Sequence, residues 1–294
     1  MLEQCIIGLA GARLTARERE WLRRRPPLGV ILFARNIVSP AQVRELLDEV
    51  RSCAGKALWA AIDEEGGRVH RMPWAPFSGR RQALAYGRWF ERDAEAARAA
   101  AFEDAREAGR ALKRLGFTHN CAPVLDVFSP AGDAVIGARA YSDRVDVVAE
   151  LATEVMRGYR EAGIEAVGKH FPGHGRADAD SHLAVPHVRA ELPLLLHEAE
   201  PFARLIAEGL QHVMTAHVIY DAVERRVATL SRFWLQQVLR TRMGFAGKIW
   251  SDDLCMRGVG EDVLGAAEEA KAAGCDVLLV CQPEGTEALY SACT

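Results

Sequence analysis

Short apolar runs alternate with longer amphipathic stretches along most of the chain. Most of the short runs are continuous rather than alternating, which is typical of strands covered on both faces. They predict strands at residues 5–9, 28–33, 57–62, 117–124, 165–170, 212–217, 248–251 and 276–281. The amphipathic stretches predict helices at residues 15–24, 40–52, 94–115, 145–162, 198–208, 231–243 and 261–273.

Several helix edges carry the expected end signals. Ser39 and Pro40 are typical of an N-cap followed by proline at the first helical position, and Gly163, Gly209 and Gly274 stand where helices should end. Eight strands alternating with helices predict an α/β fold, a (β/α)8 TIM barrel. An open sheet is less consistent, because no dinucleotide-type glycine fingerprint follows the first strand. We expect a single domain over residues 1–294, with a shortened last helix after the eighth strand.

Composition restricts the partners. The chain is 49% hydrophobic and 26% charged, as expected for a globular protein with a full core. A net charge of −3 argues against nucleic acid or an anionic membrane surface as the main partner. No apolar run approaches the roughly 20 residues of a membrane span, and the N-terminus lacks signal-peptide features. The seven scattered cysteines predict reduced thiols in a cytoplasmic protein, which we expect to be a monomer.

Polar groups gather after the predicted strands, where a barrel places its active site. Residues 63–71 follow the third strand, Asp126 and Arg139 the fourth, residues 169–182 the fifth, His217 the sixth and residues 251–253 the seventh. Each of these polar groups also has a purely structural interpretation, which stays open. Asp252 and Asp253 could be an N-cap pair for the next helix, and Asp63 could form an ion pair with Arg68 or Arg71. Lys169 and His170 could be a buried polar pair, Arg139 a surface cation and His217 a core histidine.

Residues 169–182 form the densest of these segments. They contain three histidines (His170, His174, His182) and two aspartates, on a Gly- and Pro-containing frame that is typical of a loop. Histidine can give and take a proton near neutral pH. An aspartate two residues before His182, Asp180, could orient it. Retaining glycoside hydrolysis needs a carboxylate nucleophile and a separate acid/base group, roles that Asp252 and His182 would fill.

Three segments, residues 63–71, 169–182 and 251–256, strongly resemble motifs of the bacterial β-N-acetylglucosaminidases of glycoside hydrolase family 3. The likeness extends over essentially the whole chain, in the same order, and is greatest to single-domain cytoplasmic enzymes of cell-wall recycling. Two features depart from the family pattern. Position 64 is Glu where the family usually has Gln, and the chain is shorter at its C-terminus than family members usually are.

The resemblance implies a TIM barrel that removes non-reducing terminal GlcNAc from GlcNAc-1,6-anhydroMurNAc and its peptide forms, without a metal or other cofactor. It implies Asp252 as the nucleophile and His182, assisted by Asp180, as the acid/base group. It also implies that the GlcNAc ring is bound by Asp63, Arg71, Arg139, Lys169 and His170.

Three other functions remain open at this point. Within the same family, phosphate could replace water as the acceptor, since a neutral histidine would not repel it. A metal-dependent barrel hydrolase would use His170, His174, Asp180 and His182 as ligands, although the loop lacks a rigid helical spacing. A non-catalytic sugar-binding protein is the third alternative, and the complete set of Asp252, Asp180 and His182 argues against it.

Overall fold

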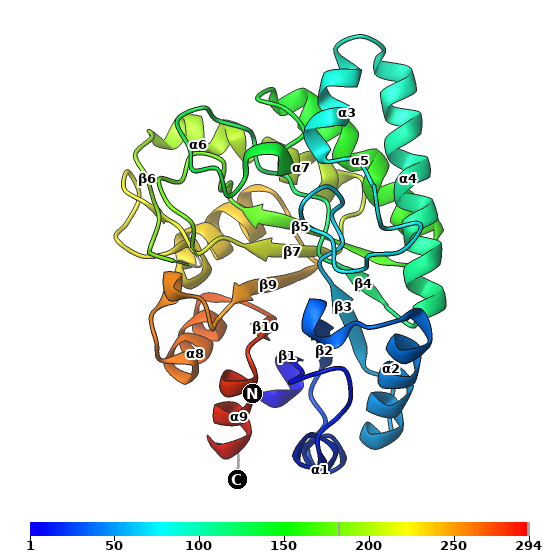
Figure 1. The fold of residues 1–294 in the computed structure, drawn as a ribbon. Coiled ribbons are helices and arrows are strands. Elements are labelled where there is room, and N and C mark those ends of the chain that lie inside the picture. Colours follow the sequence, from blue (N-terminus) through cyan, green and yellow to red (C-terminus); the bar gives the residue numbers. More distant parts are fainter. Residues whose placement is uncertain (182, 293–294) are drawn as a thin grey trace.

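The computed structural model describes residues 1–181 and 183–292. Its strands close into a parallel barrel in the order β1-β10-β9-β7-β5-β4-β3-β2 (Figure 1). The barrel strands are β1 (Cys5–Gly8), β2 (Gly29–Leu32), β3 (Trp59–Ile62), β4 (His119–Asn120), β5 (Glu165–Phe171), β7 (His212–Thr215), β9 (Lys248–Asp253) and β10 (Val277–Val280). The predicted TIM barrel is confirmed.

Helices follow the strands and cover the outside of the barrel (Figure 1). They are α1 (Ala16–Arg24), α2 (Pro40–Ala54), α4 (Ala94–Leu115), α5 (Val145–Glu161), α7 (Glu200–Ala207), the π-helix η5 (Phe233–Arg242), α8 (Val263–Ala273) and α9 (Pro283–Ala292). Single 3-10 turns lie at Leu2–Gln4, Ala34–Asn36, Gly137–Arg139, Ala228–Leu230 and Arg257–Val259. The expected short last helix is α9, with 10 residues. None of the described helices is long and apolar enough to cross a lipid bilayer.

The predicted helix ends are confirmed in the local geometry. The Ser39 side chain accepts the main-chain N–H of Gln42, and Pro40 begins α2. Gly274 ends α8 with a φ of 122°, and Gly163 and Gly209 follow α5 and α7 with φ of 74° and 92°. These positive φ angles strain residues that have a Cβ atom, so glycine is suited to them.

Some elements differ from the sequence prediction. The strand expected at residues 117–124 is regular only over His119–Asn120, because the Ala122 N–H turns back to the Asn120 carbonyl and Pro123 then has no N–H to donate. Beyond it, Val124 forms one isolated bridge with Lys169. Short elements inside the loops were missed: α3 (Ala83–Phe90), α6 (Leu192–Glu198), and the two-stranded sheet of β6 (His187–Val188) and β8 (Ile219–Tyr220). Two-residue strands are too short to produce a periodicity.

The end of the barrel away from the strand C-termini is filled by packed aromatic and histidine rings. Trp59 lies 4.3 Å from His119 and 5.8 Å from Trp250 between ring centroids, and the Trp250 indole N–H donates to Nδ1 of His212 at 3.0 Å. Burial lowers the pKa of His119 to about 3 and that of His212 to about 4. Both rings are therefore neutral in the folded protein at pH 7.

These two histidines predict a loss of stability in acid. Their folded-state pKa values lie below the unfolded value of about 6.5, so the unfolded chain binds more protons and stability falls as pH drops from there toward 4. We expect His119→Phe to remove part of this loss, on the order of a few kcal/mol. Urea unfolding at pH 7 and pH 5 measures the free energy of unfolding of both proteins. The value for His119→Phe minus that for the wild type should be more positive at pH 5 than at pH 7. An equal difference at both pH values would contradict this account.

Candidate active site

One pocket of about 400 Å³ opens at the C-terminal ends of the barrel strands. The predicted site residues that the structure describes all line it, although they come from segments far apart in the sequence. They are Asp63, Arg71, Arg139, Lys169, His170, Asp180 and Asp252. His182, the predicted acid/base residue, lies outside the described residues.

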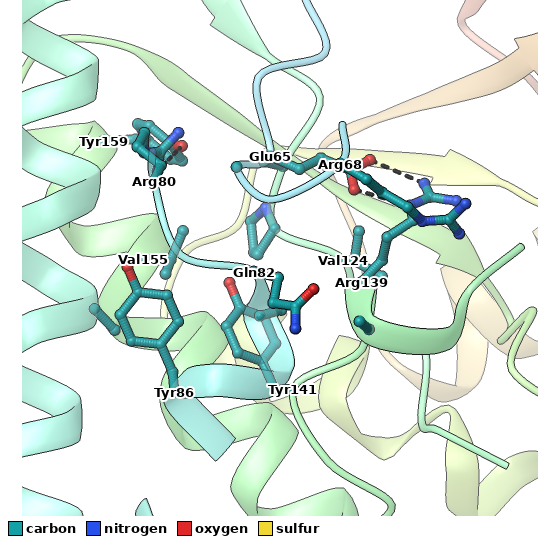
Figure 2. Close-up of a pocket in the computed structure, with 16 residues that line it drawn as sticks. Glu65, Arg68, Arg80, Gln82, Tyr86, Val124, Arg139, Tyr141, Val155 and Tyr159 are labelled. Atoms are coloured by element: carbon teal, nitrogen blue, oxygen red, sulfur yellow. Dashed lines mark hydrogen bonds and ion pairs between the residues drawn. The ribbon is translucent and has the colours of Figure 1, made fainter. Parts of the chain in front are cut away.

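A buried ion-pair cluster forms one wall of the pocket. The Lys169 ammonium, on β5, lies 2.7 Å from both Asp63 Oδ1 and Glu65 Oε1. Arg139 forms a two-pronged pair with Glu65, with both N···O distances at 2.9 Å (Figure 2), and Arg71 lies 3.3 Å from Asp63. The ion-pair interpretation of Asp63 is therefore correct for Arg71, and Arg139 is not a surface cation.

Charge compensation keeps this wall fully ionised. Burial alone would raise the pKa of Glu65, but Arg139 and Lys169 outweigh burial and hold that pKa well below its usual range. The pKa of Asp63 is lowered in the same way by Lys169 and Arg71. Burial acts to lower the pKa of Lys169, yet Asp63 and Glu65 raise it above its usual value. The wall thus presents fixed donors and acceptors, which suits a polyhydroxylated ligand.

The loop after β3 brings Glu65 into this cluster. Gly66 and Val69 pair across a tight turn, and Gly66 and Gly67 have φ of 92° and 59°. A Cβ atom on Gly67 would lie 2.6 Å from the side chain of Gln82. Glu65 was not among the predicted site residues, because its partner Arg139 is 74 residues away along the chain.

Asp126 is a second residue that was not among the predicted site residues. Its buried carboxylate lies 2.7 Å from Nδ1 of His170 and accepts the main-chain N–H groups of His170 and His174 at 3.2 and 2.7 Å. Burial would raise the pKa of Asp126, but His170 and these hydrogen bonds lower it. Such a carboxylate fixes the proton on Nδ1 of His170, which leaves Nε2 beside Arg139, 3.4 Å away. Its position directly after the fourth strand was the available signal.

Asp252 lies at the end of β9 and lines the same pocket as the ion-pair wall. Its Oδ1 accepts the main-chain N–H of Asp253 at 2.8 Å. Burial acts to raise the pKa of Asp252, but the nearby His217, His170 and Lys169 hold it below its usual range. These three side chains are far from Asp252 in the sequence. The fold brings them close to its carboxylate, where they stabilise the ionised form.

Asp253 and His217 are structural neighbours of Asp252. Asp253 Oδ1 accepts the N–H groups of Cys255 and Cys281. The N-cap interpretation of Asp252 and Asp253 is wrong, because both residues belong to β9 and the next helices are capped by Met256 and Asp262. His217 is fully buried, with Nδ1 2.7 Å from the Thr229 hydroxyl and Nε2 2.9 Å from the carbonyl of Asp253. The core-histidine interpretation is therefore confirmed in its contacts, and His217 supports the end of β9.

The loop after β5 approaches the pocket along the main chain of the preceding loop. A Cβ atom on Gly175 would lie 1.8 Å from the carbonyl oxygen of Val127, so only glycine fits there. The Tyr220 hydroxyl donates to the carbonyl of Gly173 at 2.8 Å. His174 lines the pocket, and burial lowers its pKa to about 4, so it is neutral at pH 7. Asp180 also lines the pocket from this loop.

A smaller cavity lies behind Glu65 and Arg139, among Tyr86, Tyr141 and Tyr159 (Figure 2). Its volume of about 20 Å³ is enough for a water molecule but not for a sugar. The three tyrosines therefore pack behind the ion-pair wall, and the cavity among them is not a second substrate pocket.

Among residues 1–181 and 183–292, no three His, Cys, Asp or Glu side chains are arranged to hold a metal ion. His182, the fourth ligand of the metal-dependent alternative, lies outside these residues. His170 uses its Nδ1 to contact Asp126 instead.

Known proteins resemble the whole chain. Residues 2–293 match the family described as glycosyl hydrolase family 3 N terminal domain. A β-hexosaminidase from Methylococcus capsulatus is 44% identical over 291 residues, which cover 98% of this chain and 85% of the relative. One from Xylella fastidiosa (strain M12) is 42% identical over 284 residues, covering 95% of this chain and 83% of the relative.

The fold agrees with these relatives. The crystal structure of NagZ from Neisseria gonorrhoeae in complex with N-trifluoroacetyl-D-glucosamine superposes with a TM-score of 0.91 at 35% identity, over 98% of this chain and 84% of that one. With the barrel and the pocket described above, these similarities show that the chain belongs to glycosyl hydrolase family 3 and is a glycoside hydrolase of the β-hexosaminidase type.

Proposed function

We propose that this enzyme is a retaining exo-β-N-acetylglucosaminidase that removes the non-reducing terminal GlcNAc from GlcNAc-1,6-anhydroMurNAc and its peptide forms. One observation carries the proposal: an ionised Asp252 and a wall of fixed hydrogen-bonding charges line the same pocket as Asp180. A related enzyme binds N-trifluoroacetyl-D-glucosamine, which supports a GlcNAc-type ligand.

In the proposed first step, Asp252 attacks the anomeric carbon while the bond to the leaving oxygen breaks. His182 gives its proton to that oxygen, and a covalent glycosyl-enzyme forms. In the second step His182 takes a proton from water, and this water displaces Asp252 from the anomeric carbon. Asp180 stabilises the imidazolium form of His182 and fixes its tautomer, as a triad carboxylate does.

The ion-pair wall would bind the GlcNAc ring. Its five sugar-binding side chains are held in place before any sugar arrives, by contacts with one another and with Glu65 and Asp126. They are Asp63, Arg71, Arg139, Lys169 and His170. Donors and acceptors fixed in advance lose little entropy on binding.

We further propose that this reaction belongs to cytoplasmic peptidoglycan recycling, carried out by a monomer. Among the described residues, free thiols are found at Cys53, Cys121, Cys255, Cys275 and Cys281, which fits a reducing compartment.

Release of 4-nitrophenol from its β-GlcNAc glycoside, with and without phosphate, tests the proposal. We expect release in phosphate-free buffer, with free GlcNAc as the product. Release that requires phosphate and yields a sugar phosphate would favour phosphorolysis, and no release in either buffer would contradict the proposed activity.

Removing a charged partner of the sugar should weaken binding. We expect Arg71→Ala and Lys169→Ala to raise KM, or lower kcat/KM, ten- to a hundredfold, because a hydrogen bond to a charged group contributes roughly 1.5–3 kcal/mol. Steady-state kinetics measure this, with Arg157→Ala, an exposed arginine on α5, as the matched control. Wild-type kinetics in either variant would remove that residue from the sugar site.

A further inference from the structure

Glu64 occupies an unusual position between two pocket residues. Its side chain is fully buried directly after β3. Oε2 accepts the main-chain N–H of Arg71 at 2.9 Å, whereas Oε1 has no hydrogen-bond partner among the described residues. Its own N–H and carbonyl both pair with the side chain of Asn120, at 2.9 and 3.0 Å. The carboxyl group is therefore held in one place at the base of the loop.

The partner of this carboxyl group is a residue that reaches the sugar pocket. The Arg71 guanidinium lies 3.3 Å from Asp63 and over the ring of Phe33, at 5.6 Å from its centroid. Asp63 directly precedes Glu64, whose main chain is held by Asn120, so a change in the Glu64 carboxyl contact acts on the Arg71 member of the Asp63–Arg71 pair. The hydrogen bond from Arg71 to Glu64 thus joins the two ends of the segment 64–71, which carries Arg71 at the pocket.

The groups around Glu64 leave its charge open to change near neutral pH. Burial raises the pKa of its carboxyl group to about 7, although the N–H groups of Arg71 and Met72, the Arg80 guanidinium and the nearby His70 act to lower it.

The other titratable groups nearby contact the Glu64 main chain or are paired elsewhere. Tyr159 lies 3.3 Å from the Glu64 carbonyl, and the neighbouring Asp63 and Glu65 are neutralised by Lys169 and the arginines.

We propose that Glu64 is a positioning residue that couples sugar binding to pH, because its ionised form holds the Arg71 main chain in the binding position and its neutral form holds it more weakly. This inference rests on the proposed role of Asp63 and Arg71 in binding the sugar. A hydrogen bond to a carboxylate is about twice as strong as one to a neutral acceptor. Sugar binding should therefore weaken as pH falls from 8 to 6.

Glu64→Gln tests the inference, since glutamine keeps the shape and one acceptor oxygen but cannot ionise. Isothermal titration calorimetry with GlcNAc at pH 6, 7 and 8 avoids the catalytic steps. We expect the Kd of the wild-type enzyme to rise several-fold from pH 8 to pH 6, and that of Glu64→Gln to change much less. Glu161→Gln, an exposed glutamate on α5, should follow the wild type.

Thermal unfolding separates positioning from a purely structural role. A carboxyl group with a raised folded-state pKa contributes least at high pH, because stability is lost as pH rises from the unfolded value of about 4.5 through 7. Glu64→Gln should therefore raise Tm at pH 8 and change it little at pH 5. The loss of one neutral carboxylic-acid band on raising the pH, seen by infrared spectroscopy in the wild type only, would identify Glu64 as the titrating group.

The outcomes are distinguishable. A Tm gain at pH 8 with the same pH dependence of Kd in both proteins would make Glu64 structural only and overturn the inference. The same holds if wild-type Kd does not change with pH. Failure to cleave the β-GlcNAc glycoside or to bind GlcNAc at any pH would instead contradict the proposed function.

Discussion

Asp252→Asn should lose hydrolysis by roughly 10³-fold or more in kcat/KM while keeping its fold. An amide cannot form the glycosyl-enzyme bond, whereas the carboxylate of Asp252 is kept ionised by His217, His170 and Lys169. The amide keeps an oxygen for the N–H of Asp253, so Tm should change little. Kinetics on 4-nitrophenyl β-GlcNAc and a thermal melt measure both expectations.

A fluorinated glycosyl donor that slows the second step should label Asp252 itself. Mass spectrometry of the digested protein would place the sugar on the peptide that contains residues 251–256. The matched acid is Asp253, one residue further along, whose Oδ1 is occupied by the N–H groups of Cys255 and Cys281. Label on Asp253 or Glu65 would contradict the assignment.

His182→Ala should lose far more activity on GlcNAc-anhydroMurNAc than on 4-nitrophenyl β-GlcNAc. The sugar leaving group needs a proton from His182, whereas 4-nitrophenol leaves readily without one. Deglycosylation then limits the aryl substrate, and azide, which needs no general base, should restore part of its rate. Steady-state rates on both substrates, with and without azide, provide the measurement. Asp180→Asn should show the same pattern more weakly.

His174 is the matched control on the same loop. It lines the pocket, but burial lowers its pKa to about 4, so its ring is neutral at pH 7 and does not provide the imidazolium acid. His174→Ala should therefore not show the substrate-dependent loss or the azide response. If His182→Ala is equally impaired on both substrates and does not respond to azide, another residue provides the acid/base group, and His174 becomes the next candidate.

The sequence predicted the barrel and most of the pocket for one physical reason. Continuous apolar runs predict strands, and in a parallel barrel all their C-terminal ends meet at one rim. Asp63, Lys169 and Asp252 could therefore be placed together from their positions after predicted strands. The prediction also held at helix ends such as Ser39, where a single side chain and the next few residues determine the geometry.

Long-range partners could not be predicted in this way. Glu65 belongs to the pocket wall through Arg139 and Lys169, and Asp126 through His170, and no local pattern indicates such pairs. The raised pKa of Glu64 depends on complete burial, which a position after a strand does not reveal. The β4 strand is short because the Ala122 N–H turns back to the Asn120 carbonyl just before Pro123, a backbone detail that the composition of the run does not reveal.

The anomeric form of the first GlcNAc released tests the central claim most directly. Proton NMR can follow the enzyme acting on GlcNAc-1,6-anhydroMurNAc in phosphate buffer, before the free sugar equilibrates. A double displacement at Asp252 predicts that β-GlcNAc appears first and converts to the α form afterwards. If α-GlcNAc or a GlcNAc 1-phosphate appears first, or the disaccharide is not cleaved, the proposed retaining hydrolysis of this substrate is wrong.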